Sequence, residues 1–446
     1  MILERLFQLK RENKLLITIF LLAFVLRLSL IIFRPYPFYP VKIDDGYSYD
    51  LMARNILNGH GLSAAERPPY SPTIWRTPIY PLFLAGIYAI FGHSSNNVRI
   101  IQALLDSATC FLVYLIFLAC FGDSKISKRF ALSAYILAAC CPFMAFFVSM
   151  IYSETLTTFL FTLSIYLFLL AKDNKKWKYF FIAGVSIGLA FLSRPVLSLF
   201  PLLLAAVMFF TEKKGNRKIE LFRNLAVYFI ALSLVWAPWI CRNYISFKRF
   251  IPFSIGSGTF IWISTFPPAR YEKDFLPDKD VFSKYLKLEG KELLDFDTRL
   301  KNDGLRRIKE YPFNYLIFTL KRVPLLWVSS YSYFIQIDNS FSELVGTTKD
   351  KSTNIKSQGS LYLKIFFKFL LSTLNIVLLI TGILGIIFAL KRWRRAYPIL
   401  LVPIYITIIH AGLGLATPRY SAPAWPVFLI FSVYSVRMVS SILKDR

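Results

Sequence analysis

Two adjacent carboxylates, Asp44 and Asp45, follow the first long apolar segment in the string KIDDGYSYDLMARNIL. Apolar residues then recur at helical spacing from Tyr49 to Ile56, and Gly59 stands where such a helix would end. The acids therefore lie at the N-terminal end of a short predicted helix, where free N–H groups and the helix dipole favour an ionised carboxylate. They could act as a general base or simply cap the helix, because Asp is a common N-cap residue.

A third acid, Glu154, lies between two long apolar segments in the string SMIYSETLTTFLF. An acid at such a position is costly unless it faces water, a polar cavity or a charged partner. Glu154 is therefore a candidate functional residue. The alternatives are a solvated loop residue or a cap of the following helix.

Three arginines, Arg194, Arg242 and Arg419, lie at or near the ends of apolar segments. A guanidinium group binds phosphate through two parallel hydrogen bonds, so these residues could bind a phosphate-bearing substrate. Contact with anionic lipid head groups is the alternative for each of them taken singly. The weaker candidates of the same kind are Lys42, Arg67 and Arg76.

The chain is long and apolar, with 446 residues of which 56% are hydrophobic. Apolar runs of about 20 residues recur along it, and each is long enough to cross the hydrocarbon core of a bilayer. We therefore predict an all-α polytopic membrane protein with about ten transmembrane helices, and no more than twelve. The expected spans are 15–33, 98–121, 130–150, 155–171, 178–193, 195–211, 221–241, 361–390, 397–415 and 421–442.

The excess of Lys and Arg, 53 against 26 Asp and Glu, gives a net charge of +27. We attribute this charge to cytoplasmic loops, because no nucleic-acid recognition motif accompanies it. The basic strings GDSKISKR, AKDNKKWK, TEKKGNRKIE and KRWRR all fall on one side of the ten-span scheme. By the positive-inside rule that side is cytoplasmic, both termini are cytoplasmic, and the candidate acids and arginines are external.

Two apolar stretches, 78–92 and 313–335, do not fit this scheme, because counting both as spans would reverse the charge rule. We expect them to be helices at the outer membrane interface. The scheme then divides the chain into three parts. These are an N-terminal transmembrane module over 1–241 with a first external loop at 34–97, an external region at 242–360, and C-terminal transmembrane helices over 361–446.

Cysteine and histidine give no evidence of a metal or disulfide framework. The five cysteines lie in apolar segments without metal-type spacing, and the three histidines are scattered along the sequence. His410 falls within an expected span, where we predict an interior histidine whose hydrogen bonds are satisfied.

These strings, in this order, resemble the polyprenol-phosphate-sugar-dependent glycosyltransferases of the GT-C fold, which include protein O-mannosyltransferases and lipid A aminoarabinose transferases. The resemblance covers most of the chain. It rests on IDDGYSYDLMARNIL followed by GHG, on RTPIYPLFLAGIYAIFG, on the acid after the third span, on PWICRNY with FIPFS, and on PRYSAPAWP.

The resemblance implies roles for several residues. The family's catalytic carboxylate stands four residues before a tyrosine, which corresponds to Asp45 with Tyr49, and Asp44 is the alternate. Glu154 replaces the family's usual Asp after the third span. The lysine that aminoarabinose enzymes carry in the first loop has no clear counterpart. Asn243 and Tyr420, which directly follow two of the arginines, are further candidates.

The implied reaction is an inverting displacement, in which a sugar leaves a polyprenyl phosphate for a lipid, glycan or protein acceptor. Asp45 would take the acceptor proton, and Arg194, Arg242 or Arg419 would stabilise the departing phosphate. The chemistry requires no cofactor, although a divalent metal could bind between two carboxylates. The implied location is a bacterial inner membrane, with the site on its external face.

Two other classes of protein compete with this interpretation. A transporter or flippase of lipid-linked saccharides would carry ionisable residues deep within its spans, and only Arg27 and His410 stand out in this way. A structural membrane anchor would leave the external acids without a role. The sequence identifies neither the sugar nor the acceptor.

Overall fold

The computed structural model describes residues 2–33, 45–122, 124–211, 216–268, 281, 284, 288, 290–329, 355–414 and 416–444. Helices are the regular elements of this part of the chain, and one isolated antiparallel bridge joins Ser63 to Pro72. The predicted all-α fold is therefore confirmed. Asp44 and Lys42 lie outside the described residues.

The described helices differ in length, from 4 to 35 residues. The longer ones are α1 (Ile2–Phe33), α4 (Ser95–Phe121), α5 (Lys125–Cys140), α7 (Glu154–Asn174), α8 (Trp177–Ser193), α10 (Asn216–Phe247), α13 (Gly290–Glu310), α14 (Pro312–Trp327), α16 (Ile355–Ala389), α17 (Trp393–Gly412) and α18 (Trp425–Lys444), of which α5 and α14 are equal at 16 residues. The shorter ones are α2 (Asp45–Leu57), α3 (Ile79–Phe91), α6 (Pro142–Ala145), α9 (Phe200–Thr211) and α11 (Ser257–Ser264). Four 3₁₀ segments connect them, namely η1 (Phe146–Ser149), η2 (Pro195–Leu197), η5 (Leu390–Arg392) and η6 (Pro418–Ala424).

Six helical segments of the described chain are long and apolar enough to span a membrane, and a seventh is added if the bent pair at 125–149 is one span. The predicted number of about ten is not reached by these criteria. One reason is that α8 and α9 are shorter apolar helices. The other is that α16 and α17 follow each other within one apolar segment, Tyr362–Gly412, joined by η5.

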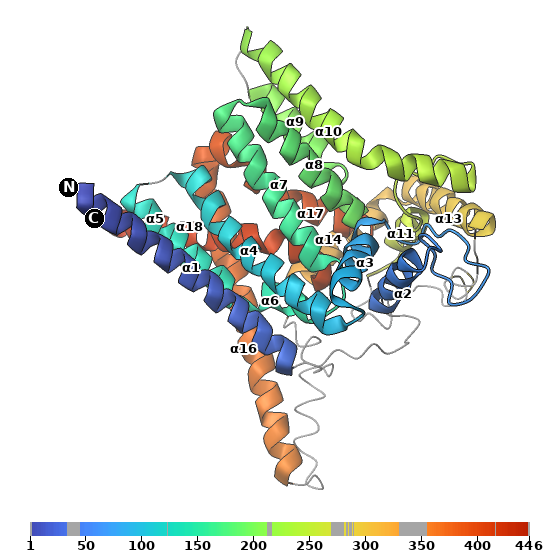
Figure 1. Ribbon diagram of the computed structural model, residues 1–446, viewed down its shortest axis with the longest axis horizontal. Helices are drawn as coiled ribbons and strands as arrows, with labels where there is room; N and C mark the ends of the chain where they lie inside the picture. The colour runs from blue at the N-terminus through green and yellow to red at the C-terminus, as the bar shows by residue number, and fades with distance from the viewer. Residues whose placement is uncertain are drawn as a thin grey trace.

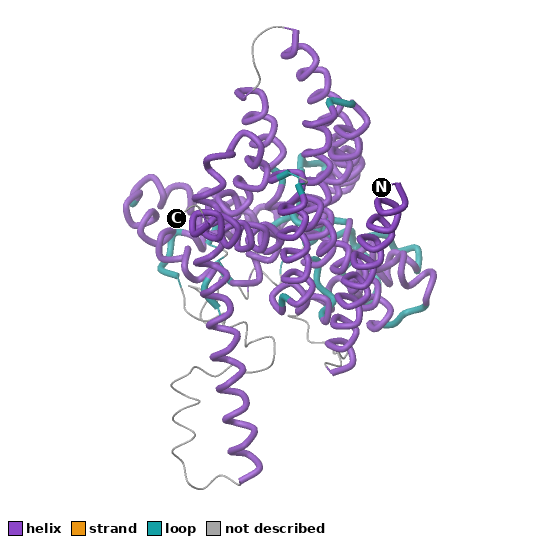
Figure 2. Tube along the Cα trace, turned by 90° about the vertical axis from the view of Figure 1, so that its left-hand side faces the viewer, coloured by secondary structure: helices purple, strands orange, loops and turns teal. Residues whose placement is uncertain are grey.

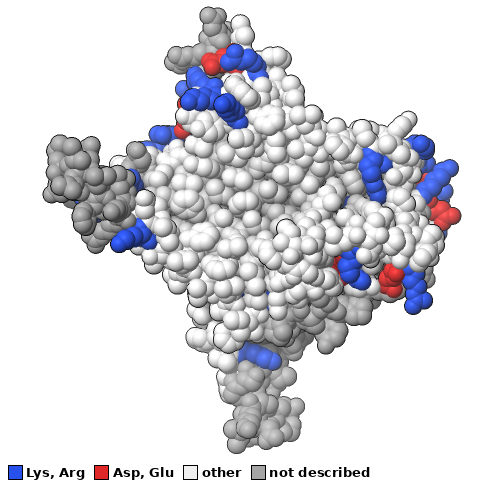
Figure 3. Space-filling model, viewed as in Figure 1, with Lys and Arg blue, Asp and Glu red and all other residues white. Residues whose placement is uncertain are grey.

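The arrangement in space separates two ends of the helical bundle. Figure 1 shows both termini at one end, while α2, α3, α11 and α13 gather at the other. The tube in Figure 2 shows the same bundle from the side, with helices making up almost all of the described chain. Figure 3 shows a broad surface without charged groups across the middle of the molecule, with Lys, Arg, Asp and Glu gathered at its margins. This distribution is typical of a protein that sits in a bilayer.

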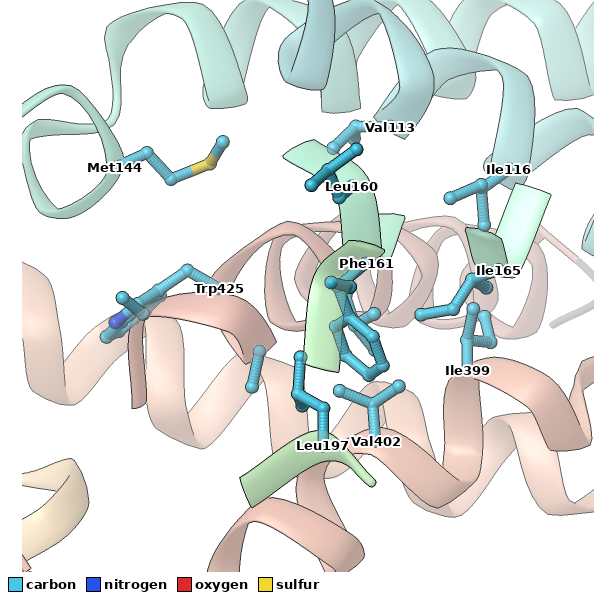
Figure 4. Packing of buried hydrophobic residues seen from close by; sticks show 14 of the residues in the cluster. Val113, Ile116, Met144, Leu160, Phe161, Ile165, Leu197, Ile399, Val402 and Trp425 are labelled. Carbon is cyan, nitrogen blue, oxygen red and sulfur yellow. The ribbon is translucent and has the colours of Figure 1, made fainter. Parts of the chain in front are cut away.

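The core of the bundle is built around α7, which packs against α4, α8, α17 and η6. Figure 4 shows part of this cluster, with Phe161 and Ile165 of α7 among side chains of α4, η2 and α17. The Phe161 side chain is inaccessible to solvent and contacts Phe200 edge-to-face, with the ring centroids 4.9 Å apart. The first residue of α7, Glu154, is thereby held by a packed helix.

Arg27, one of the two ionisable residues expected deep in the spans, is fully buried and paired. Its Nε donates to Asp106 Oδ2 at 2.8 Å, and its Nη2 donates to the Ala138 carbonyl at 3.1 Å. The pair joins α1 to α4 and α5. An ion pair is what an isolated charge in the hydrocarbon region requires.

The two stretches expected at the interface are helical where they are described, as α3 and α14. Phe313, Leu316 and Leu320 of α14 are exposed, while Arg322 is buried and donates to the Phe266 carbonyl at 2.5 Å. Arg322 thus caps carbonyls at the end of α11, as cations at helix C-termini often do. The location of α3 and α14 at the outer membrane interface stays a prediction.

The helices α16 and α18 pack closely against each other. A Cβ atom placed on Gly385 would overlap the backbone of Phe431, whereas one placed on Gly86 of α3 would have no neighbour within 4 Å. The Gly385 position therefore requires the absence of a side chain, as small residues do where transmembrane helices approach closely.

We expect Gly385→Ala to lower the free energy of unfolding by about 1–3 kcal/mol, because the helices must separate to admit the methyl group. Gly86→Ala, the matched control, should leave stability unchanged or raise it by up to about 1 kcal/mol. Titration of both variants with a denaturing detergent in mixed micelles measures the difference. Equal midpoints for the two variants would contradict this packing.

Candidate active site

Asp45 is the first residue of α2, and both of its carboxylate oxygens are bonded to arginines. Oδ1 accepts from Nη2 of Arg76, and Oδ2 lies 2.7 Å from Nη2 of Arg419. Gly59, with φ of +79°, follows the helix and donates to the Ile56 carbonyl at 3.2 Å, so the helix ends where the sequence predicts. The Asp45 carboxylate is therefore part of an ion-pair cluster.

Glu154, the first residue of α7, lies in the same cluster. Its Oε1 accepts from Nε of Arg419 and lies 3.3 Å from Nη1 of Arg194. The Glu154 side chain is inaccessible to solvent, and its Oε2 has no hydrogen-bond partner among the described residues. Arg419 thus bridges the carboxylates of Glu154 and Asp45, which are 109 positions apart in the sequence.

Aromatic rings support each of the three arginines of this cluster. The guanidinium carbon lies 5.2 Å from the Tyr49 ring centroid for Arg76, 4.9 Å from that of Tyr420 for Arg194, and 4.1 Å from that of Tyr152 for Arg419. Such cation–π contacts favour a charged guanidinium and restrict its orientation. We call the five charged residues, Arg76, Arg194, Arg419, Asp45 and Glu154, the arginine–carboxylate cluster.

The cluster is graded in exposure. The accessible fraction of the side chain is 33% for Arg76 and 23% for Asp45, 18% for Arg419 and 13% for Arg194, and 0% for Glu154. Asp45 and Arg76 therefore form the accessible rim, while Glu154 forms the floor. With three guanidinium groups and two carboxylates ionised, the cluster carries a formal charge of +1, which suits a monoanionic ligand.

The electrostatics of the cluster favour the ionised form of Asp45. Burial alone would raise the pKa of this carboxyl, but the guanidinium groups of Arg76 and Arg419 outweigh burial and hold its pKa well below the usual range. The same attraction raises the pKa of Arg76 above its usual value, against the effect of burial. In this state Asp45 is an ionised carboxylate with a weak tendency to take a proton.

A second set of hydrogen bonds fixes α2, and with it Asp45. The carboxylate of Asp50 accepts from Tyr88 and His93, each at 2.8 Å, and from Arg54 at 2.9 Å. These bonds tie α2 to the end of α3 and to the turn before α4. Asp50 is itself buried, so its charge requires these partners.

Arg242 and Asn243 are bonded to backbone carbonyls outside the arginine–carboxylate cluster. Arg242 donates to the carbonyls of Thr73, at 2.8 Å, and Leu62, at 3.1 Å. Asn243 is buried and donates to the Ile251 carbonyl at 2.9 Å. Arg242 therefore braces the loop between α2 and α3, and Asn243 braces the turn after α10. Among the described contacts, neither side chain is bonded to Asp45 or Glu154.

The structure brings Asp45, Glu154, Arg194 and Arg419 together, with Tyr49 and Tyr420 beside them. Arg76 was only a weak candidate in the sequence, because one arginine in a long loop has no distinguishing pattern. The signal available was its place in RTPIYP, directly before an apolar helix. Tyr152 was not predicted at all, since an aromatic residue in an apolar segment is ordinary.

His410 corrects a prediction from the sequence. It is buried and stacks on Tyr420 with the ring centroids 5.0 Å apart, but its Nδ1 has no hydrogen-bond partner among the described residues. The expectation of a histidine with satisfied hydrogen bonds is therefore wrong. The physical reason is that stacking on Tyr420, rather than hydrogen bonding, fixes the ring.

In the part of the chain that the structure describes, no group of three or more His, Cys, Asp or Glu residues is suited to a metal ion. The charged groups that converge are mainly guanidinium groups, which bind oxyanions such as phosphate in a planar, two-bond geometry.

Comparison with protein families gives one match. Residues 75–240, a little over a third of the chain, match the model of the dolichyl-phosphate-mannose-protein mannosyltransferase family. This segment contains Arg76, Glu154 and Arg194 of the cluster. A search of curated proteins found no match to the chain.

Comparison with solved structures gives the fold. The archaeal oligosaccharyltransferase AglB from Archaeoglobus fulgidus, in complex with an inhibitory peptide and a dolichol-phosphate, aligns with a TM-score of 0.52 and 16% identity over 97% of this chain. The same enzyme tethered to an acceptor peptide aligns with a TM-score of 0.53 and 17% identity over 96% of this chain. The alignments cover 51% and 50% of those chains, so this chain spans about half the length of that oligosaccharyltransferase.

A weaker structural likeness is to ArnT from Cupriavidus metallidurans bound to undecaprenyl phosphate, with a TM-score of 0.43 and 14% identity over 96% of this chain and 78% of that one. The predicted GT-C fold is confirmed by the family match and by the oligosaccharyltransferase structures.

The bridge made by Arg419 predicts a large effect on stability. Arg419→Gln leaves the buried Glu154 with only the 3.3 Å contact to Arg194, so we expect a loss of about 3–5 kcal/mol in the free energy of unfolding. Arg249→Gln, which breaks a half-exposed pair with Asp295, should cost less than about 1 kcal/mol. Detergent-denaturation midpoints compare the two, and similar losses would show that Glu154 does not depend on Arg419.

Proposed function

We propose that this protein transfers a sugar from a polyprenyl-phosphate donor to a hydroxyl-bearing acceptor, with Asp45 as the general base. The observation that carries the proposal is the arginine–carboxylate cluster, which joins a partly exposed carboxylate to three guanidinium groups. A carboxylate can accept the acceptor's proton, and guanidinium groups can stabilise the departing phosphate. The two chemical requirements of such a transfer therefore meet in one place.

The proposed reaction is a single inverting displacement. The acceptor oxygen attacks the anomeric carbon from the face opposite the phosphate. The bond between that carbon and the phosphate oxygen breaks, and the electron pair stays on the phosphate. The acceptor proton passes to the carboxylate of Asp45 within hydrogen-bond reach. Asp44, which lies outside the described residues, is the alternate base.

The proposed phosphate ligands are Arg76, Arg194 and Arg419. They lie within one cluster. The rings of Tyr49, Tyr420 and Tyr152 contact the faces of these guanidinium groups, so the edges that carry the N–H donors stay available for hydrogen bonding. Arg242 is no longer a favoured ligand, because its nitrogens are bonded to backbone carbonyls. The structurally similar archaeal oligosaccharyltransferase is in complex with a dolichol-phosphate, which supports a lipid phosphate as the donor's leaving group here.

The membrane orientation belongs to the same proposal. The basic loops at one end of the bundle assign that end, with both termini, to the cytoplasm. The cluster then faces the external side of a plasma membrane, where the acceptor is a lipid, a glycan or a protein. The helices α3 and α14, which cover the described helical parts of the two apolar stretches, lie at that interface.

A transport function finds less support in the structure. The buried residues Arg27 and Asp106 are bonded to each other, and Arg27 is also bonded to the Ala138 carbonyl, in a closed contact. A translocation pathway would instead present ionisable groups along a route between the two ends of the bundle.

The Asp45→Asn variant tests the base. We expect transfer from a polyprenyl-phosphate sugar to fall by at least about 100-fold, since general-base catalysis contributes roughly 10²–10⁴-fold. Asp295→Asn, which removes a half-exposed acid of α13, should retain full activity. Both variants are purified in detergent and assayed with the same labelled donor. Full activity of Asp45→Asn would rule out the assignment of Asp45.

The depressed pKa of Asp45 predicts a pH dependence. In the free protein this carboxyl is ionised at every pH above its lowered pKa, so kcat/KM for the donor should show no acid limb from Asp45 between about pH 5 and 8. Arg76→Gln removes one of the cations that lower this pKa, so its acid limb should move to higher pH. An acid limb of the wild type at about pH 4, the ordinary range of an Asp carboxyl, would contradict the electrostatic argument.

A further inference from the structure

The contacts of Asp45 conflict with the two roles proposed for the cluster. A general base needs a basic oxygen directed at the acceptor, yet each Asp45 oxygen is already bonded to a guanidinium group, of Arg76 or Arg419, which weakens its basicity. A phosphate needs guanidinium groups, yet these two are already bonded to Asp45. The carboxylate and the phosphate therefore compete for the same cations.

We propose that the donor phosphate itself releases Asp45, by taking over the guanidinium groups of Arg76 and Arg419 that hold the carboxylate in the free protein. Donor binding then precedes and creates the active base, and Asp45 stays blocked as long as no phosphate is bound. This inference rests on the proposed function and adds to it a regulation of the same site.

The geometry of Arg419 permits this exchange without loss of its position. Its Nε is bonded to the buried Glu154, while a different nitrogen, Nη2, reaches Asp45. The Tyr152 ring lies against the guanidinium group. Arg419 can therefore exchange Asp45 for a phosphate oxygen at Nη2 while Glu154 and Tyr152 hold the rest of the side chain.

Arg76 permits the exchange for a different reason. Its side chain is one-third exposed, and its contacts among the described residues are Asp45 and the Tyr49 ring. A ligand that approaches from the rim can reach this guanidinium directly. Glu154 does not compete for Arg76, because it lies at the floor and contacts Arg194 and Arg419.

The charges of the reaction are consistent with this exchange. The cluster carries +1, and a glycosyl phosphodiester carries −1, so the complex is neutral. On transfer the acceptor proton neutralises Asp45, and the phosphate becomes a monoester with up to two negative charges. Negative charge thus moves from the carboxylate to the phosphate, which the two arginines already hold. No other reactant is required.

Binding of a lipid phosphate to an inactive variant tests the competition. If Asp45 competes for the arginines, Asp45→Asn should bind geranylgeranyl phosphate about tenfold more tightly than the wild type, although it cannot catalyse transfer. Geranylgeraniol, which lacks the phosphate, should bind both proteins equally. Asp295→Asn makes the same change in net charge on α13 and should bind like the wild type. Affinity is measured in detergent micelles by microscale thermophoresis.

A second variant keeps the inference testable if Asp45→Asn does not fold. Arg76→Gln should bind geranylgeranyl phosphate about tenfold more weakly than the wild type, with unchanged binding of geranylgeraniol. Arg249→Gln is the matched control and should not change either affinity.

The outcomes separate this inference from the proposed function. Tighter binding by Asp45→Asn, or weaker binding by Arg76→Gln where only that variant folds, supports the exchange. Unchanged or weaker binding by a folded Asp45→Asn overturns the exchange but leaves a glycosyltransferase with Asp45 as its base. Failure of the wild type to bind geranylgeranyl phosphate above the level of geranylgeraniol overturns both.

Discussion

The bond network of Arg419 is the interaction on which the arrangement of the site depends. A fully buried carboxylate such as Glu154 costs several kcal/mol unless a cation and further hydrogen bonds compensate it. Arg419 supplies that cation, and its other edge reaches Asp45. Three segments remote in sequence, the starts of α2 and α7 and the segment η6, must therefore meet at one point.

The bilayer explains why these charged groups gather at one end of the bundle. Within hydrocarbon every backbone polar group must be satisfied inside its own helix, so irregular segments and charges collect where helices end. Asp45 and Glu154 begin helices, Arg194 follows the end of α8, and Arg419 lies in η6 before α18. Successive crossings can bring such junctions to the same end of the bundle, and the ion pairs among Asp45, Glu154, Arg194 and Arg419 show that these junctions meet.

The same contacts serve stability and chemistry. The arginines that compensate Asp45 and Glu154 in the free protein are the groups best suited to hold a phosphate, and they cannot do both fully at once. Natural sites often carry such a conflict, because the interactions that favour function differ from those that favour the resting fold. The split contacts of Arg419, with one nitrogen on Glu154 and another on Asp45, allow one bond to change while the other persists.

Much of the fold followed from local patterns. Apolar length predicted the helices, Gly59 predicted the end of α2, and the string SMIYSE predicted an acid at the start of α7, because periodicity and helix-end signals are properties of neighbouring residues. The number of spans was less certain, because α8 and α9 are short and α16 and α17 share one apolar segment.

The residues that form the site could be predicted only in part from their neighbours in the sequence. The sequence by itself determined which acids and arginines stand at helix ends, since this depends on the order of apolar and polar residues along the chain. Only the tertiary structure decided which of them meet. It joined Arg76 to Asp45 and directed Arg242 to backbone carbonyls, because contacts between segments 31 to 374 positions apart are set by how whole helices pack.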